Sequence, residues 1–337
     1  RVVNIVLKAD FRSLTASVNV SRSDQGGRTT TASENNLLKI AGADRWSLDI
    51  NGESSNALYE TERNIDRTDS NRVDSAGDNG ERNAYRTLLP RAAEASVAGT
   101  YKHDLNDKVG MTLSGSLEDS SSRSYSGLPG FSLSLPAGNP WSPGGAAADL
   151  YRYVGLPDAL QRQTNTRAAE LGTVFDGYLG DWRWTATGEY SRTETDTTTG
   201  RGVSAAALQA AITAGDTTVN PFGDLTGAVT TYARDTANSI SQSAEAELVL
   251  NGTAWELPAG GVTTTFKVGG EHQSLDSESV RSGVTTDRSQ SRDLGSLQAN
   301  FDLPISSVDR GVLPKIGDLS ANMNLAYQEL SDFGGVS

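Results

Sequence analysis

The 337-residue chain carries a net charge of −13, contains no cysteine, and is only 36% hydrophobic. The lack of cysteine excludes disulfides and thiolate chemistry, and the acidic balance with scattered lysine and arginine argues against a nucleic-acid partner. No stretch approaches the 18 or so apolar residues of a transmembrane helix. A water-soluble protein fits this composition, and so does a transmembrane β-barrel, whose apolar band uses only alternate residues of each strand.

The chain opens with a short apolar run, RVVNIVLK over residues 1–8, that differs from everything after it. A continuous apolar run suits a strand that is buried on both faces. We therefore expect residues 1–10 to be the end of a separate, preceding domain. The chain begins without methionine or a signal peptide, and its last residues follow directly on a predicted strand, so we interpret it as a fragment of a longer precursor.

Beyond this run, apolar and polar residues alternate with a period of two, which is typical of a strand with one apolar and one polar face. The clearest case is the hairpin Glu170–Ser191, which places Leu171 and Phe175 on one face and turns at Gly180-Asp181. Its arms are close to the roughly 9–11 residues with which a tilted strand crosses a bilayer. Eleven such strands follow one another, near residues 14–21, 31–41, 46–59, 95–101, 109–118, 170–179, 182–191, 240–250, 262–271, 297–303 and 319–328.

The connections between these strands alternate in length. Short turns lie near residues 43, 106 and 181, whereas long polar loops are expected over 64–91, 121–165, 196–237 and 277–292. Within the loops, Ala146–Tyr153 is a candidate short helix, and Ser204–Ile212 reads as a helix with Ser204 as N-cap and Gly215 beyond its end. Short turns at one end and long loops at the other are the signature of outer-membrane barrels.

Charged residues stand in the middle of several strands, on the polar face. A small closed soluble barrel would have to bury them, and an unpaired buried charge costs several kcal/mol or more. A wide, wet lumen removes that cost. The charges in question are Asp49, Lys102, Asp176, Arg183, Glu245, Lys267 and Asp302.

Aromatic residues fall near strand ends, where barrels carry girdles at the two membrane interfaces. The predicted girdle comprises Trp46, Tyr101, Trp182, Trp184, Trp255 and Tyr327. Together these signals predict an all-β fold, a transmembrane antiparallel up-and-down β-barrel over residues 11–337. Because single-chain bacterial barrels normally have an even number of strands, eleven strands should be the front part of a larger barrel.

Several segments resemble one family. RVVNIVLK directly before the first barrel strand resembles the end of the plug domain in TonB-dependent outer-membrane receptors, and VNPFG at 219–223, FKVGGEHQ at 266–273 and GDLSANMNLAYQELSDFG at 317–334 resemble the same family. That family has 22 strands around a plug, so the visible strands would be the N-terminal half of its barrel. Most of the plug, the TonB box and the rear half are not seen in this sequence.

The resemblance implies an outer-membrane receptor that takes up a scarce nutrient, such as a siderophore, cobalamin or saccharide, with energy from the TonB complex. Its partners would be outer-membrane lipid or lipopolysaccharide, the nutrient, and the TonB protein through the unseen plug. A passive outer-membrane channel and a surface β-rich adhesin or structural protein are the alternatives. An upstream plug would argue against the channel, and recovery only in detergent would argue against the adhesin.

Ligand contact is expected in the second long loop, because loops on a rigid scaffold often carry function and aromatic and arginine side chains suit stacking and bidentate hydrogen bonds. The alternative is that the same residues pack the loop on itself. The candidates are Arg123, Tyr125, Phe131, Trp141, Tyr151, Arg152 and Tyr153.

We expect no enzyme, cofactor or metal site. The sequence contains no G-x-S-x-G, P-loop, H-E-x-x-H or S-x-x-K motif. His103 and His272 are far apart and favour chance positions near strand ends over a metal site. The acidic residues of the first long loop lack the EF-hand spacing and favour a solvated loop over a calcium site; they are Asp66, Asp69, Asp74, Asp78 and Glu81.

Overall fold

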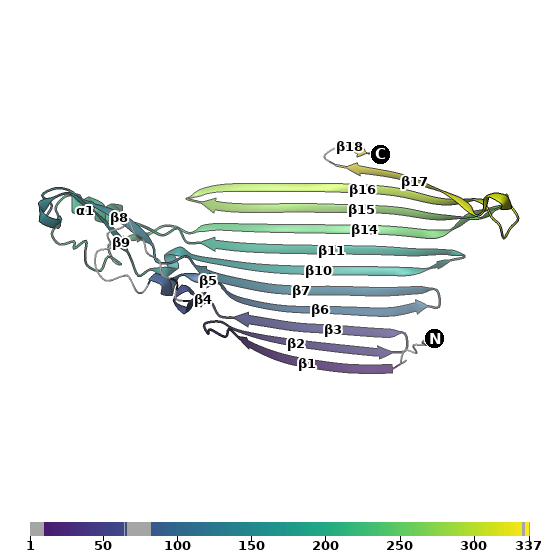
Figure 1. Cartoon of the computed structure of the whole chain (residues 1–337), viewed down its shortest axis with the longest axis horizontal. Helices are drawn as coiled ribbons and strands as arrows, with labels where there is room; N and C mark the ends of the chain where they lie inside the picture. Colours follow the sequence, from purple (N-terminus) through teal and green to yellow (C-terminus); the bar gives the residue numbers. More distant parts are fainter. Residues whose placement is uncertain (1–9, 64, 66–81, 332–333, 337) are drawn as a thin grey trace.

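One antiparallel sheet organises the chain in the computed structural model, which describes residues 10–63, 65, 82–331 and 334–336 (Figure 1). Each strand pairs with the strands before and after it in the sheet, as the sequence predicts, and the sheet contains eleven long strands. These are β1 (Asp10–Arg22), β2 (Thr29–Ala41), β3 (Asp44–Ser55), β6 (Arg91–Asn106), β7 (Val109–Tyr125), β10 (Gln161–Leu179), β11 (Trp182–Thr199), β14 (Asp235–Leu257), β15 (Gly260–Arg281), β16 (Val284–Ser306) and β17 (Leu319–Leu330).

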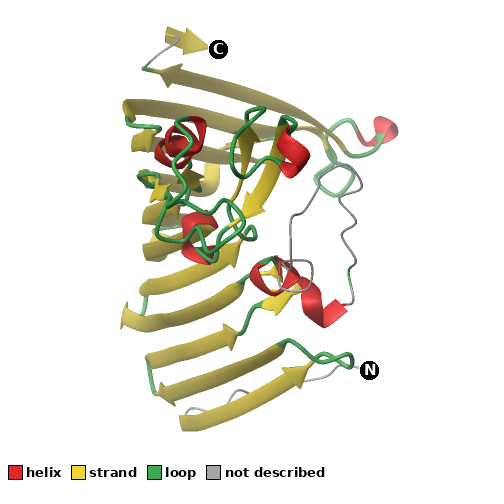
Figure 2. Ribbon diagram, turned by 90° about the vertical axis from the view of Figure 1, so that its left-hand side faces the viewer, coloured by secondary structure: helices red, strands yellow, loops and turns green. Residues whose placement is uncertain are grey.

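The sheet is an open, curved wall (Figure 2). Its order runs from β1 at one edge to the short strand β18 (Gly334–Val336) at the other, and the described residues do not close it into a barrel. The predicted end of a plug over residues 1–10 lies outside the described residues except for Asp10, which begins β1. The acidic residues 66–81 of the first loop also lie outside them.

The strand register separates two faces across the whole sheet. We call the face that carries Leu171 the apolar face and the face that carries Glu170 the polar face. Leu171 stands opposite Gly115 on β7 and Tyr190 on β11. The same row of cross-strand partners continues through Leu48, Leu37 and Leu14 to the edge strand. Because side chains alternate along each strand, this register fixes the face of every residue of the sheet.

The two ends of the sheet differ, as predicted (Figure 1). At the turn end, two-residue connections follow β2, β6, β10 and β14, and a longer connection over residues 307–318 follows β16. At the loop end, β3, β7 and β11 lead into the long segments 56–90, 126–160 and 200–234. The second and third loops are therefore shorter than the predicted 121–165 and 196–237, because their strands continue as polar ladders beyond the apolar stretch.

The loop predicted over 277–292 is wrong. β15 and β16 run on to a two-residue turn of Ser282 and Gly283, both with positive φ, 52° and 79°. Such turns match the twist of hairpin strands and join them tightly. The outer parts of both strands are polar on both faces, so the alternation that marks a strand in the sequence is missing there.

Small elements fold the loops. The first loop contains β4 (Leu58–Tyr59), the 3-10 helices η1 (Glu60–Arg63) and η2 (Arg82–Tyr85), and β5 (Thr87–Leu89). The second contains β8 (Gly130–Leu135), β9 (Ala148–Tyr153), η3 (Pro143–Gly145) and η4 (Pro157–Leu160). The third contains β12 (Val203–Ser204), α1 (Ala206–Thr213) and β13 (Thr230–Thr231), and η5 (Pro314–Ile316) lies at the turn end.

Two local predictions need correction. The candidate helix Ala146–Tyr153 is wrong, because β9 occupies this segment and pairs with β8 from Gly130 to Leu135. The helix predicted with Ser204 as its N-cap starts one residue later, with Ala205 at the N-cap position and no side-chain capping bond there. The Ser204 hydroxyl accepts a 3.4 Å bond from the Ala206 amide instead. Gly215 follows the helix end with φ +75°, as predicted.

The largest buried apolar cluster lies in the loops and not on the sheet. It joins side chains from the second and third loops: Leu133, Leu135, Leu150, Val154, Ala159, Val203, Leu208, Ile212 and Leu225. The long side chains of the sheet's apolar face are mostly exposed, among them those of Leu14, Val18 and Leu171. No helix of the described chain is long and apolar enough to cross a membrane.

Candidate functional site

Aromatic side chains line the turn end of the apolar face. Trp46 on β3 stacks on Tyr101 of β6 with ring centroids 4.0 Å apart. The Tyr101 hydroxyl donates to Asp44 at 2.8 Å, and Nδ1 of His103 lies 2.7 Å from the same carboxylate. This part of the face is therefore amphipathic, with aromatic carbon beside hydrogen-bonded polar groups, which suits a membrane interface.

A second aromatic series continues along the same end. Trp182 stacks on Phe266 at 6.0 Å, Phe266 meets Phe301 edge to face at 5.8 Å, and Phe301 lies 6.0 Å from Trp255. Val262 and Thr264 stand opposite Trp255 and Phe301 in the register, and both side chains are 0% exposed.

The predicted girdle residues thus share one face. The register places Trp46, Tyr101, Trp182, Trp184 and Trp255 near the turn end, whereas Tyr327 lies near the loop end of β17. Their role at a membrane interface stays a prediction.

Charged and hydroxyl side chains cover the polar face. The register places all seven charges singled out in the sequence on it. One cross-strand row brings Glu189, Glu245 and Glu271 directly opposite one another on β11, β14 and β15. Like charges in this arrangement repel one another, and the repulsion is tolerable only where water and salt screen it. Toward the turn end from this row, Lys267 forms a 2.5 Å ion pair with Glu247.

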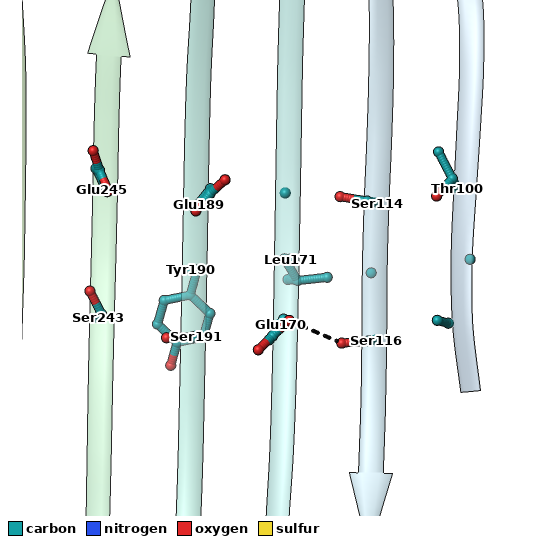
Figure 3. A pocket seen from close by; sticks show the side chains of 14 residues that line it. Thr100, Ser114, Ser116, Glu170, Leu171, Glu189, Tyr190, Ser191, Ser243 and Glu245 are labelled. Atoms are coloured by element: carbon teal, nitrogen blue, oxygen red, sulfur yellow. Dashed lines mark hydrogen bonds between the residues drawn. The ribbon is translucent and has the colours of Figure 1, made fainter. Parts of the chain in front are cut away.

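The polar face contains a depression of about 400 Å³ at this carboxylate row (Figure 3). Side chains from β6 to β14 line it, including Thr100, Ser114, Glu170, Glu189 and Glu245. The hydroxyl of Ser116 donates to Glu170 at 3.4 Å. The wall therefore offers carboxylates and hydroxyls to whatever occupies the space in front of it.

The second and third loops fold together into one body, which we call the loop unit (residues 126–160 and 200–234). It projects beyond the loop end of the sheet (Figure 1). Gln209 of α1 bonds the backbone of Ser134 on β8 twice: its Oε1 accepts from the amide at 2.8 Å, and its Nε2 donates to the carbonyl at 2.9 Å. Asn139 donates to the carbonyl of Ile212 at 2.6 Å. All three bonds span more than 70 residues of sequence.

Arg152 also joins the two loops. Its guanidinium donates to the carbonyls of Phe222 and Gly223, at 3.3 and 2.7 Å, and the residue is buried. Trp141 packs against the apolar cluster and donates from Nε1 to the carbonyl of Asp216 at 3.5 Å. The arginine and the tryptophan therefore hold the loop unit together.

Hydrogen-bonded turns shape the third loop. The pKa of Asp216 is lowered because the hydroxyl and the amide of Thr218 donate to its carboxylate. The pKa of Asp224 is lowered as well, first by the amide of Thr226 and then by the Thr226 side chain. Both carboxylates therefore stay ionised to a lower pH than an ordinary aspartate does.

The structure divides the seven predicted ligand residues into two groups. Phe131, Trp141, Tyr151, Arg152 and Tyr153 belong to the loop unit, where the two tyrosines meet edge to face at 5.0 Å. Arg123 and Tyr125 lie at the end of β7. Arg123 donates to Gln163 at 3.3 Å, and the backbone of Tyr125 is bonded to the Thr87 hydroxyl. Ligand contact by these residues stays a prediction.

The two histidines lie apart on the apolar face. His103 faces Asp44 near the turn end, and His272 lies 2.6 Å from Asp293, beyond the apolar stretch of β15 and β16. In each ring, Nδ1 thus has one carboxylate as its neighbour. Across the described residues, no group of three or more histidine, aspartate or glutamate side chains is arranged to hold a metal ion.

Two solved structures illustrate a similar course of the chain. A variant of the ferric enterobactin receptor PfeA from Pseudomonas aeruginosa matches 96% of this chain and 40% of its own, with 10% identity and a TM-score of 0.48. The open form of the ferric-catecholate import receptor Fiu from E. coli K12 matches 98% of this chain and 57% of its own, with 10% identity and a TM-score of 0.42. The chain thus spans less than two thirds of either receptor. No protein-family model and no curated protein matches the sequence.

The loop unit is the feature that the sequence does not reveal. The alternation of Phe131, Leu133 and Leu135 and the helix near Ser204 are visible signals of ordered segments. The sequence does not show that these segments pack together, because the two loops are separated by the hairpin β10–β11. They meet only when that hairpin brings their ends together.

Proposed function

We propose that this chain forms part of a barrel in the bacterial outer membrane, with the apolar face toward lipid and the polar face toward a wet lumen. One observation carries the proposal: the two faces continue in a single register through all eleven long strands. A soluble sheet would cover such an apolar face with a second layer. Here its large side chains, such as those of Leu117, Leu171 and Leu325, are exposed.

The edges of the sheet support a larger barrel. Backbone groups left unpaired in hydrocarbon cost several kcal/mol each, so only a closed sheet is stable in a membrane. Further strands would therefore have to pair with β1 and with β17 and β18. The family that the sequence resembles closes 22 strands around a plug, and we propose the same arrangement, with the residues before Asp10 as the end of the plug.

We further propose that the protein is a receptor that takes up a scarce nutrient with energy from the TonB protein. The loop unit stands at the end where the outer loops of such barrels face the surroundings. Its packed core supplies a rigid platform for ligand contact, and the carboxylate-rich wall lies on the path beneath it. A siderophore, cobalamin or a saccharide fits this proposal, and no chemical step on the nutrient is needed.

A pair of arginine substitutions tests the membrane placement. Leu325 and Asn324 are neighbours on β17, both exposed, and lie on the apolar and the polar face. Leu325→Arg should reduce the folded fraction, because an arginine facing lipid costs about 2–4 kcal/mol near the bilayer centre. Asn324→Arg should leave it unchanged. Heat-modifiable gel mobility of outer-membrane fractions measures the folded fraction. Equal tolerance of both, or recovery without detergent, would instead favour the surface adhesin.

Deletion of the gene tests the transport. Growth of the deletion strain on single scarce nutrients should fail for one of them, and uptake of that nutrient by the intact strain should require a functional TonB protein. A passive channel would take up the nutrient equally well without the TonB protein. That outcome would retain the barrel and reject the active-transport proposal.

A further inference from the structure

The connection between β16 and β17 displays aliphatic side chains at the turn end. Residues 307–318 separate the two strands, whereas the other connections at this end are two residues long. Val308, Leu313 and Ile316 are 50%, 58% and 62% exposed. Ile305 and Leu319, which flank the connection, are exposed as well.

The connection is an ordered structure. The Ser306 hydroxyl donates to the carbonyl of Gly317 at 2.6 Å, and the amide of Val308 donates to Asp318 at 2.8 Å. Arg310 forms a 3.2 Å ion pair with Glu256 at the end of β14. These polar groups thus bond within the protein, while the aliphatic side chains are left exposed.

The backbone at Leu313 is unfavourable for its residue type. Leu313 has φ 48° and ψ 47°, a left-handed conformation that glycine or asparagine adopts far more readily. Pro314 follows it and opens η5, which ends at Ile316. Because its side chain is 58% exposed, Leu313 has little packing against the protein to offset this strain.

The strands beside this connection indicate what covers it. Ser306 is buried and stands opposite Leu319, which shares the apolar face of β17 with Met323 and Leu325. The bond from Ser306 to Gly317 therefore fixes the end of η5 beside that face. Through Ser306 and Leu319, the connection adjoins the face that the proposed function assigns to lipid.

We propose that η5 and the residue before it are inserted in the periplasmic leaflet of the outer membrane. Leu313 and Ile316 lie among the acyl chains, and Lys315 between them reaches the phosphates of the lipid headgroups, since a long basic side chain extends toward the interface. This inference rests on the proposed function, because it requires the apolar face to meet lipid.

Single spin labels test the insertion. The chain contains no cysteine, so an introduced one is labelled selectively. Nitroxides are attached to Ile316→Cys, to Leu325→Cys on the apolar face, and to Val284→Cys, an exposed turn position at the opposite end. In outer-membrane vesicles holding the intact protein, collision rates with oxygen and with a water-soluble nickel chelate are measured for each label.

The label at position 316 should resemble that at 325, with a ratio of oxygen to nickel collisions several-fold higher than at 284. A ratio at 316 equal to that at 284, with 325 still shielded from nickel, would overturn the insertion and retain the membrane barrel. Shielding of 316 from both reagents would overturn it too, in favour of a covering protein. A label at 325 as accessible to nickel as that at 284 would reject the proposed function itself. Leu313→Cys provides a second label in case Ile316→Cys does not fold.

Discussion

The indole of Trp184 lies over Gly177 on the neighbouring strand of the apolar face. A Cβ atom added to Gly177 would lie 3.1 Å from Nε1 of Trp184 and 2.6 Å from the carbonyl oxygen of Lys108. The second contact is with backbone, which cannot move aside cheaply. The tryptophan thus covers a strand position that only glycine can fill, an arrangement that also supports the glycine within the sheet.

Gly177→Ala should therefore destabilise the sheet, by about 1–3 kcal/mol as for other overpacking substitutions. Gly295→Ala is the matched control. This glycine also lies on the apolar face, on β16, and nothing lies within 4 Å of a Cβ atom added to it. Urea unfolding in detergent, followed by gel mobility, measures both. A Gly177 variant as stable as the control would contradict this packing.

Arg152→Met should loosen the loop unit without unfolding the sheet. The substitution removes two charge-assisted hydrogen bonds, from the Arg152 guanidinium to the carbonyls of Phe222 and Gly223. Each such bond is worth about 1.5–3 kcal/mol. Limited proteolysis should then cut within residues 200–234 faster than in the parent. Arg123→Met, at an exposed bond to Gln163, is the control and should be cut at the parental rate.

Ile212→Ala should open the same unit through its core. Ile212 is 0% exposed within the apolar cluster, and truncating such a side chain costs about 2–5 kcal/mol. Phe222→Ala, at a 37% exposed ring, should cost far less. Amide hydrogen exchange should rise in both loops of the unit and stay unchanged in β10 and β11. A rise in amide hydrogen exchange that is confined to the third loop would show that the two loops fold separately.

Acid should loosen the third loop through Asp216 and Asp224. Their lowered pKa values mean that the folded loop binds fewer protons than the unfolded chain, so their contribution is complete above the ordinary value of 3.8 and is lost as pH falls through the folded values. A nitroxide on the exposed Thr217→Cys should become more mobile below about pH 4. This increase in nitroxide mobility should be absent from the double variant Asp216→Asn with Asp224→Asn. An increase that persists there would show that other groups cause it.

The hairpin around Gly180 shows how far local pattern reaches. Alternation alone places Leu171 and Trp184 on one face and Asp176 and Arg183 on the other, and the register agrees. Beyond the apolar stretch the same strands continue as polar ladders, such as Thr164 opposite Thr197, and there the sequence carries no periodic signal of a strand. The sequence therefore predicts strand ends too early where the hydrogen-bonded ladder extends past the apolar stretch.

The sequence by itself determined the sheet, the count of its long strands, its two faces and the difference between its ends, because each follows from side chains that alternate over a few residues. Only the tertiary structure decided how the loops fold. Arg152 reads as a ligand residue in the sequence, yet it donates to carbonyls some 70 residues away. The paired strands bring the ends of these two loops together, and burial of an apolar cluster shared between them then fixes which surfaces of the loop unit stay exposed.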